Sequence, residues 1–320
     1  MQSHDPGYSL AAYAAMLMDD ERARAYITAM EQSIRPGDLV IEIGAGPGIF
    51  SMLAARMGAR KVIAVECNPS IRLARRLVQH NNLVNKVVCI EGLSTDLQLA
   101  ERANVIISDL RSVLPLYSHH IPSIVDARER LLVEGGTLIG FRDRLFAAPV
   151  EHAEEHQRLT RPWLVNDFGL DLSAGFAFEV NRWSKVNLRP EQLLADGQQW
   201  LVLDYSHASD PTASARLEWE IERSGKIHGI ALWFDAELAP GIGFSNRPRE
   251  RSLIYGQAFL PLPRGVSAEP GSKIFAEIHA HWVNKQYVWH WKGSVVDAAG
   301  STLEKFDQST VGRRLMIPGN

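Results

Sequence analysis

The sequence predicts an α/β domain with a mostly parallel sheet, followed by an antiparallel β-sandwich or β-barrel. Between residues 39 and 141, strand-like apolar runs alternate with helical patterns, which favours a parallel sheet with helices on both faces. From Phe178 onward, short alternating runs are separated by Gly/Pro clusters, which is typical of antiparallel strands. Seven of the eight tryptophans lie at or after Trp183 and would fill a small all-β core. We therefore expect two domains, at residues 1–146 and 147–320.

Periodicity and turn residues bound each expected element. Residues 10–33 carry apolar or small side chains at helical spacing, Gly58 is a helix-ending signal, and Asn68-Pro69 is a helix-starting signal. In the first domain we expect strands at 39–43, 61–66, 86–91, 104–108 and 137–141, and helices at 10–33, 47–57, 69–81 and 120–132. In the second domain, alternation predicts strands at 200–203, 215–221, 227–234, 252–260, 273–282 and 287–291.

Composition narrows the class of protein. The 320 residues carry a net charge of −3, so no overall basic field is available to hold nucleic acid. Two cysteines, Cys67 and Cys89, imply no disulfide scaffold, and a reducing cytoplasm is the default expectation. The apolar stretch from Leu10 to Met18 is short and is followed by acids, so we expect neither a signal peptide nor a membrane span.

The most informative motif is a glycine-rich turn between two apolar runs. Gly44, Gly46 and Gly48 follow the strand at 39–43, and Glu66 ends the next strand, 22 residues after Gly44. Glycines allow the backbone to approach a ligand closely, because no Cβ intrudes. A carboxylate at the end of the second strand can accept hydrogen bonds from both ribose hydroxyls. The pattern therefore predicts a nucleotide-type cofactor site.

Details of the turn distinguish a dinucleotide from S-adenosylmethionine. A dinucleotide motif has a third small residue where Ile49 stands here, and Pro47 removes one N–H donor from a phosphate cradle. Glu42 lies in the strand before the turn, and its negative charge would be repelled by a phosphate. A cationic cofactor without phosphate fits better, so we expect S-adenosyl-L-methionine, bound by Glu42, Ala45, the three glycines and Glu66.

Residues after the fourth expected strand are candidates for chemistry. Ser108 and Asp109 end this strand, so Asp109 would face the sulfonium and hold a nitrogen acceptor in line with the methyl group. The alternative for Asp109 is a helix cap. His119, in the loop that follows, could take a proton from the acceptor, although loop histidines are often simply exposed.

Further polar residues are candidates for cofactor contacts or for metal binding. Thr95 and Asp96 follow the third strand and would meet adenine, and Cys67 lies directly after Glu66 beside the site. Glu277, His279 and His281 alternate on one face of a later strand, which is a spacing that can hold a metal. Nothing nearby in the sequence completes such a site, so no metal is expected.

The chain resembles the protein arginine methyltransferases over nearly its whole length. The matching segments are Met16–Asp19 with Arg22 and Tyr26, Val40–Ser51 with Ala54-Ala55 and Gly58-Ala59, Val105–Asp109, Leu131–Gly136 and Gly229–Asp235. The resemblance implies a Rossmann-like class I methyltransferase domain followed by an antiparallel β-barrel. It also implies that Arg22 binds the cofactor carboxylate, and that an arm at about 150–176, with Trp163–Ser173, joins a head-to-tail homodimer.

The chain departs from this family at the substrate loop. The first of two family glutamates is Asp109, and the second position falls at Ser118, without an acid. The barrel motif Thr-His-Trp is replaced by Leu253-Ile254-Tyr255, and the family's N-terminal histidine appears as Tyr13. Arg111 in this loop would repel a cationic acceptor and favour a substrate bearing a carboxylate.

Three functions remain open at this point. The first is N-methylation of a guanidinium or amine on a small molecule or free amino acid. The second is methylation of protein or peptide arginine. The third is a catalytically silent, dimeric binding protein, suggested by the missing second glutamate at Ser118.

Overall fold

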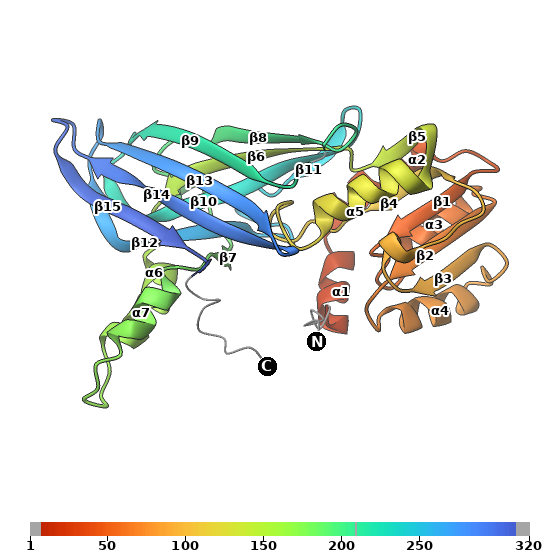
Figure 1. Ribbon diagram of the computed structural model, residues 1–320, viewed down its shortest axis with the longest axis horizontal. Helices are drawn as coiled ribbons and strands as arrows, with labels where there is room; N and C mark the ends of the chain where they lie inside the picture. The colour runs from red at the N-terminus through yellow and green to blue at the C-terminus, as the bar shows by residue number, and fades with distance from the viewer. Residues whose placement is uncertain (1–7, 209, 312–320) are drawn as a thin grey trace.

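A computed structural model describes residues 8–208 and 210–311. It consists of a parallel α/β unit at one end and a long antiparallel β unit at the other (Figure 1). The helices and strands are α1 (Leu10–Leu17), α2 (Asp20–Ser33), β1 (Leu39–Ile43), α3 (Ile49–Arg56), β2 (Lys61–Glu66), α4 (Ile71–His80), β3 (Val87–Glu91), β4 (Ala103–Ser108), α5 (His120–Asp126), β5 (Leu132–Ile139), β6 (Arg142–Val150), α6 (Ala153–Leu164), α7 (Ser173–Glu179), β7 (Ser184–Val186), β8 (Gln198–Asp204), β9 (Ala213–Glu220), β10 (Gly225–Ala239), β11 (Ile242–Ser245), β12 (Gln257–Ala268), β13 (Lys273–Val283), β14 (Gln286–Val296) and β15 (Thr302–Ser309).

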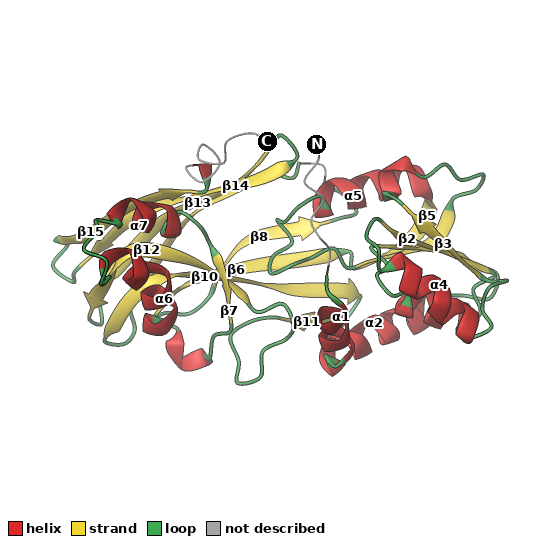
Figure 2. Cartoon of the chain, turned by 90° about the horizontal axis from the view of Figure 1, so that it is seen from below, coloured by secondary structure: helices red, strands yellow, loops and turns green. Residues whose placement is uncertain are grey.

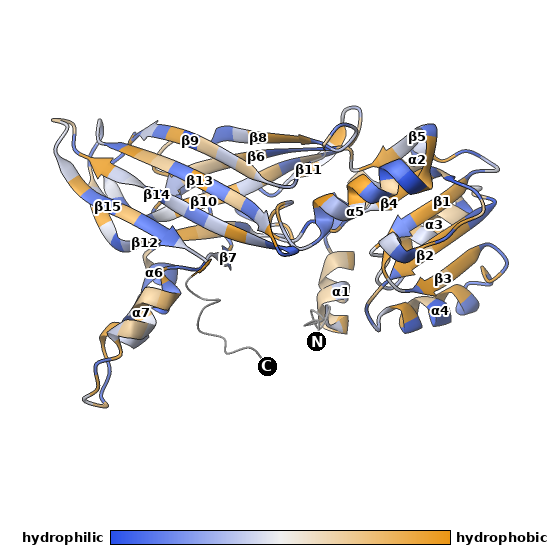
Figure 3. Ribbon diagram, in the orientation of Figure 1, coloured by the Kyte–Doolittle hydropathy of each residue, from blue (hydrophilic) through white to orange (hydrophobic). Residues whose placement is uncertain are grey.

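The first unit confirms the predicted α/β fold. Its five strands are parallel in the order β3-β2-β1-β4-β5, with α5 on one face and α2 and α4 on the other (Figure 2). All five residues of β1 are buried, as expected for a central strand covered on both faces. Figure 3 shows apolar residues along these strands. Because all strands run the same way, their C-terminal ends meet at one edge, where the glycine turn lies.

Two expected boundaries in this unit are wrong. The helix expected at 10–33 is two helices, because the Asp19 side chain caps α2 by accepting a hydrogen bond from the Arg22 N–H (3.3 Å). The strand expected at 137–141 begins at Leu132, since a short π-helical turn at Ala127–Leu131 feeds directly into it.

The second unit contains two antiparallel sheets. One has the order β7-β12-β10-β6-β8, with β11 paired to β10, and the other has the order β15-β14-β13-β9. Strand β6 pairs with β10 along its whole length, so the domain boundary that we expected at residue 146 falls inside a strand of this unit. A helical arm, α6 and α7, projects from it (Figure 1).

One hydrophobic core runs through both units. Most buried apolar residues of the parallel sheet and of the antiparallel sheets form one continuous cluster, and a second, smaller cluster includes Val150, Leu159 and Phe259. At the junction, the ring of Tyr26 from α2 lies 6.2 Å from that of Phe244 from β11. The edge beside β1 and β4, where the sequence predicts a ligand crevice, therefore lies next to a packed contact between the two units. Within the described residues, no helix has both the length and the apolar character needed to cross a bilayer.

Candidate active site

The glycine turn lies at the C-terminal end of β1 and is fixed to the neighbouring strand. Gly44, Gly46 and Gly48 have φ values of +72°, +52° and +73°, a region that favours glycine. The backbone N–H groups of Gly44 and Ala45 both donate to the carbonyl of Val65 in β2 (2.9 and 3.0 Å). A Cβ on Gly46 would lie 2.6 Å from the ring of Tyr13, so only glycine fits beneath α1.

Glu66 ends β2 beside this turn, at the position that the sequence predicts. Its Oε2 accepts a hydrogen bond from Gly46 N–H (2.8 Å), and its Oε1 accepts one from Asn68 N–H (2.9 Å). The carboxylate is buried and points at the turn. Since each carboxylate oxygen can accept more than one hydrogen bond, acceptor capacity remains for hydroxyl groups of a ligand.

Glu42 is also buried, but its carboxylate is engaged within the chain. Its Oε2 accepts hydrogen bonds from the N–H (2.7 Å) and the Oγ (2.5 Å) of Ser51 in α3. Burial raises the pKa of Glu42 to about 7, against the opposing effect of the Ser51 hydrogen bonds. In this state Glu42 ties β1 to the first turn of α3, and its role toward a cofactor stays a prediction.

Arg22 and Asp109 meet in the crevice. Arg22 Nη2 lies 2.5 Å from Asp109 Oδ2, and Nε donates to the same oxygen at 2.8 Å. The guanidinium also lies near the rings of Tyr26 and Phe50, at 5.3 and 5.4 Å from their centroids. Phe50 follows the glycine turn directly, so Arg22 lies beside the turn as well as beside Asp109.

The carboxylate of Asp109 is ionised despite its burial. Burial alone would raise the pKa of Asp109, but the positive charges of Arg22 and Arg111 hold it below its ordinary value. Within the described residues, neither Asp109 Oδ1 nor Ser108 Oγ has a hydrogen-bond partner, although both atoms are buried. Asp109 Oδ1 instead lies 3.6 Å from Arg111 Nη1, so its charge is balanced although it accepts no hydrogen bond.

The predicted effect of Arg111 on a cationic acceptor is wrong. Its side chain is fully buried, and Nε donates to both carboxylate oxygens of Asp143 in β6 (2.9 and 2.8 Å). Nη1 donates to Tyr26 Oη at 2.9 Å. The charge of Arg111 is therefore buried at the junction of the two units, paired with Asp143 and 3.6 Å from Asp109 Oδ1, and the side chain is not exposed to a substrate.

The remaining predicted residues lie farther out. His119 is exposed, and its ring packs edge-on against Trp282 (5.4 Å) without a hydrogen bond to Asp109. Its neighbour His120 is the buried one and shares a hydrogen bond of 2.9 Å with Tyr205 Oη. Thr95, Asp96 and Cys67 are exposed near the strand ends, and Cys67 forms no disulfide.

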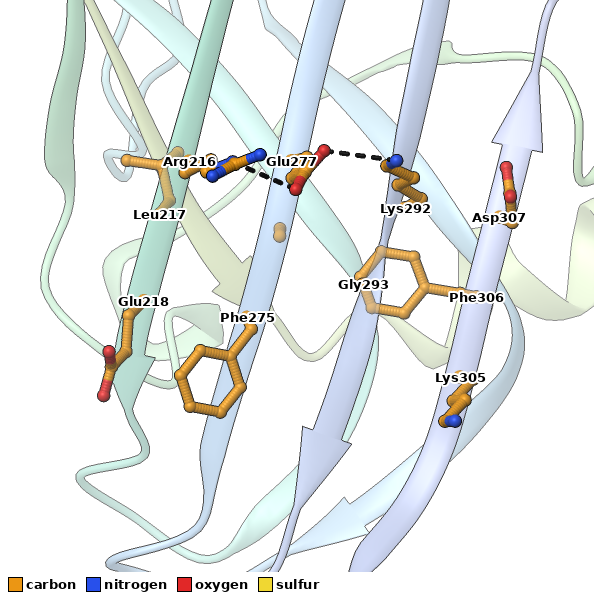
Figure 4. A pocket seen from close by; sticks show the side chains of 11 residues that line it. Arg216, Leu217, Glu218, Phe275, Glu277, Lys292, Gly293, Lys305, Phe306 and Asp307 are labelled. Carbon is orange, nitrogen blue, oxygen red and sulfur yellow. Dashed lines mark ion pairs between the residues drawn. The ribbon is translucent and has the colours of Figure 1, made fainter.

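Glu277 on β13, which the sequence analysis considered as a metal ligand, is engaged in ion pairs. Glu277 pairs with Arg216 of β9 (3.0 Å) and with Lys292 of β14 (3.3 Å), as Figure 4 shows. These residues line an open hollow of about 810 Å³ on the outer sheet. In the part of the chain that the structure describes, no cluster of His, Cys, Asp and Glu is arranged to hold a metal ion.

Tyr255 is the residue of this site that the sequence did not single out. Its hydroxyl donates to Asp109 Oδ2 at 2.6 Å and accepts a hydrogen bond from Arg22 Nε at 2.9 Å. The replaced barrel motif was the only signal at this position, and it did not indicate a contact with Asp109, 146 residues earlier.

Known proteins resemble this chain in part of the sequence and in nearly all of the fold. The family model of ribosomal protein L11 methyltransferase (PrmA) matches residues 22–140. A probable protein arginine N-methyltransferase 6.1 of Oryza sativa subsp. indica is 29% identical over 241 residues, covering 72% of this chain and 62% of the relative. An arginine N(omega)-methyltransferase of Streptomyces achromogenes subsp. streptozoticus is 26% identical over 265 residues, covering 81% and 73%. The chain spans 58–62% of the length of three plant relatives.

Solved structures show the same fold. Protein arginine methyltransferase 10 of Arabidopsis thaliana superposes with a TM-score of 0.82 at 23% identity, over 94% of this chain and 97% of that one. The Trypanosoma brucei PRMT1 enzyme-prozyme complex with AdoHcy superposes with a TM-score of 0.84 at 20% identity, over 94% and 98%. Both the predicted α/β domain and the β-barrel are confirmed by these neighbours. In sequence and in fold, this chain is similar to the protein arginine N-methyltransferases.

Proposed function

We propose that this protein is an S-adenosyl-L-methionine-dependent methyltransferase that methylates a guanidinium nitrogen of arginine. The observation that carries the proposal is the convergence of the glycine turn, Glu66, Arg22 and Asp109 at one edge of the parallel sheet. The relatives are named as arginine methyltransferases, and one structural neighbour is described as a complex with AdoHcy.

The crevice residues fit this cofactor. Glu66 retains acceptor capacity for ribose hydroxyls, and among the described residues the buried Ser108 Oγ has no hydrogen-bond partner. The ring of Tyr13 packs over Gly46. Arg22 uses Nε and Nη2 on Asp109, which leaves its Nη1 to bind the carboxylate of the methionine moiety. Ala45, Gly48 and Cys67 would line the same crevice, and Thr95 and Asp96 would face adenine.

The chain contributes binding and orientation to the reaction. The bound cofactor supplies an electrophilic methyl group on a sulfonium. Asp109 would accept hydrogen bonds from the N–H groups of the guanidinium and orient the nitrogen that is methylated, and the proton which this nitrogen loses would pass to solvent. Since His119 is exposed and makes no contact with Asp109, a role for it in removing the proton remains only a prediction.

The acceptor that we favour is arginine in a protein or peptide, because most of the similar proteins are named for protein arginine. A small arginine-like molecule is the second candidate. Two observations favour it: Ser118 replaces the second carboxylate that would clamp a guanidinium, and one relative is named for arginine without mention of a protein.

An acceptor screen with labelled cofactor tests this function. We expect methyl transfer to arginine-containing peptides or to free arginine, and a fall of roughly 10- to 100-fold when Asp109 is replaced by Asn, because a charge-assisted hydrogen bond is lost. Mass spectrometry of the acceptor identifies the methylated atom. Asp307→Asn is a matched control, since Asp307 lies on β15 of the barrel and its side chain is 72% exposed. Full activity of Asp109→Asn contradicts the role of Asp109, and no transfer to any acceptor favours the silent binding protein.

We further propose a homodimer formed through the helical arm. The end of α6 and the loop that follows it expose four large apolar side chains, of which Phe168 is 76% exposed; the others are Leu164, Val165 and Leu170. An apolar tip of this kind is typical of a surface covered by another molecule. We expect Phe168→Glu to shift sedimentation from dimer to monomer, whereas Leu303→Glu on β15 should not. An unchanged sedimentation coefficient for Phe168→Glu would rule out the arm as the dimer contact.

A further inference from the structure

Asp109 is held by donors from both structural units. Arg22 comes from α2 of the α/β unit, whereas Tyr255 comes from the segment that leads into β12 of the barrel. Both donate to the same oxygen, Asp109 Oδ2, and Arg22 Nε also donates to the Tyr255 hydroxyl. The three side chains therefore form a closed ring of hydrogen bonds at the mouth of the crevice.

The ring of Tyr255 has little freedom to move. It stacks on Phe244, with centroids 5.4 Å apart and planes inclined by 10°, and it meets Phe234 edge-on at 5.3 Å. Tyr255 is 7% exposed. Burial raises the pKa of this phenol well above its ordinary value, so the hydroxyl remains protonated and donates.

A single acid fixes the chain on both sides of this contact. Asp19 Oδ1 accepts a hydrogen bond from the Arg22 N–H, and Asp19 Oδ2 accepts one from the Ile254 N–H (2.8 Å). The start of α2 and the segment carrying Tyr255 are thereby tied together through one carboxylate. These two backbone contacts to Asp19 help to set the relative position of Arg22 and Tyr255, in addition to the hydrogen bond between their side chains.

We propose that Tyr255 is a positioning residue, whose hydroxyl holds the Asp109 carboxylate in one orientation toward the acceptor. This inference rests on the proposed methyltransferase function. Arg22 is shared between Asp109 and the cofactor carboxylate in the proposed function, whereas Tyr255 belongs to the barrel and is a donor to Oδ2 with no assigned cofactor contact. This chain has Asp109 where the similar family has a glutamate, and Leu253-Ile254-Tyr255 where that family has Thr-His-Trp. The proposal explains the two departures together, because Tyr255 contacts Asp109.

The charged and titratable groups around Asp109 determine how it responds to loss of the hydroxyl. Arg22 and Tyr26 face it from α2, Arg111 from the loop after β4, the buried His120 from α5 and Tyr255 from the barrel. Asp143 lies behind Arg111 on β6. The two arginines and the Tyr255 hydrogen bond all lower the pKa of Asp109. Removing the hydroxyl therefore raises this pKa, while the two arginines remain.

The test compares Tyr255→Phe with the parent chain in the ligand-free protein and in the assay. Carbon-13 NMR of the Asp carboxyl groups, assigned with Asp109→Asn, should show the Asp109 titration moving to higher pH. The acid limb of kcat/KM should move to higher pH with it, and kcat/KM at neutral pH should fall about tenfold. Calorimetric affinity for S-adenosylhomocysteine should change less than threefold, because Arg22 is retained.

Tyr287→Phe is the matched control, because the Tyr287 hydroxyl donates to the Pro211 carbonyl within the barrel and away from Asp109. It should leave the Asp109 titration and the pH profile unchanged. The proposal is overturned if Tyr255→Phe leaves the Asp109 titration where it is in the parent chain, or if it shifts the titration no more than Tyr287→Phe does. The NMR result does not need turnover, so failure to find any methyl acceptor would overturn the proposed function and not the role of Tyr255.

Discussion

Replacing Arg111 with Ala is expected to lower the free energy of unfolding by about 3–5 kcal/mol, because it leaves a buried carboxylate without its counter-charge. Asp143 is 0% exposed, and both of its oxygens accept from Arg111 Nε. The same substitution removes the donor to Tyr26, whose hydroxyl bonds the Ser108 carbonyl at the end of β4 (3.1 Å). Urea unfolding followed by circular dichroism measures the change.

Arg216→Ala is the control for this experiment. Arg216 also pairs with a carboxylate, Glu277, but its side chain is 85% exposed and the pair is screened by solvent. We expect its unfolding curve to overlay that of the parent chain. Equal midpoints for Arg111→Ala and the parent chain would mean that the junction between the two units does not depend on this ion pair.

Replacing Arg22 with Ala is expected to weaken S-adenosylhomocysteine binding by roughly 10- to 150-fold, the value of one charge-assisted contact of about 1.5–3 kcal/mol. The loss comes from the carboxylate of the ligand. Binding of 5′-methylthioadenosine, which has no carboxylate, should therefore change little. Isothermal titration calorimetry with the two ligands on the same preparation separates a local effect from misfolding.

Arg24→Ala provides a second control, because Arg24 lies on the same helix but its side chain is 81% exposed. Its affinity for both ligands should match that of the parent chain. Equal losses of S-adenosylhomocysteine and 5′-methylthioadenosine affinity in Arg22→Ala would contradict carboxylate recognition by Arg22.

The sequence predicted those site residues whose position follows from the parallel sheet. The glycine turn, Glu66 and Asp109 each follow a buried strand, so the rule that ligands bind at the C-terminal strand ends brings them to one edge. Their local signals, glycine spacing and an acid at a strand end, lie within a few residues of one another. The fold class could be predicted for the same reason, since alternation and turn residues are local patterns.

The residues that the sequence did not predict correctly depend on contacts between distant segments. Arg111 is neutralised by Asp143, 32 residues later and in a different sheet, and a sequence shows an arginine in a loop without showing its partner. Tyr255 reaches Asp109 only because the barrel packs against α2 through Tyr26 and Phe244. The break between α1 and α2 did have a local signal, because Asp19 followed by Asp20 and Glu21 is typical of a helix start.

The central claim is that the crevice beside the glycine turn and Glu66 binds a sulfonium nucleoside. The most direct measurement is calorimetric titration of the purified chain with S-adenosylhomocysteine and, separately, with NAD. We expect saturable one-to-one binding of S-adenosylhomocysteine, weakened in Glu66→Gln, and no heat of binding with NAD. Tight binding of NAD, or no binding of S-adenosylhomocysteine by a folded parent chain, would contradict the claim.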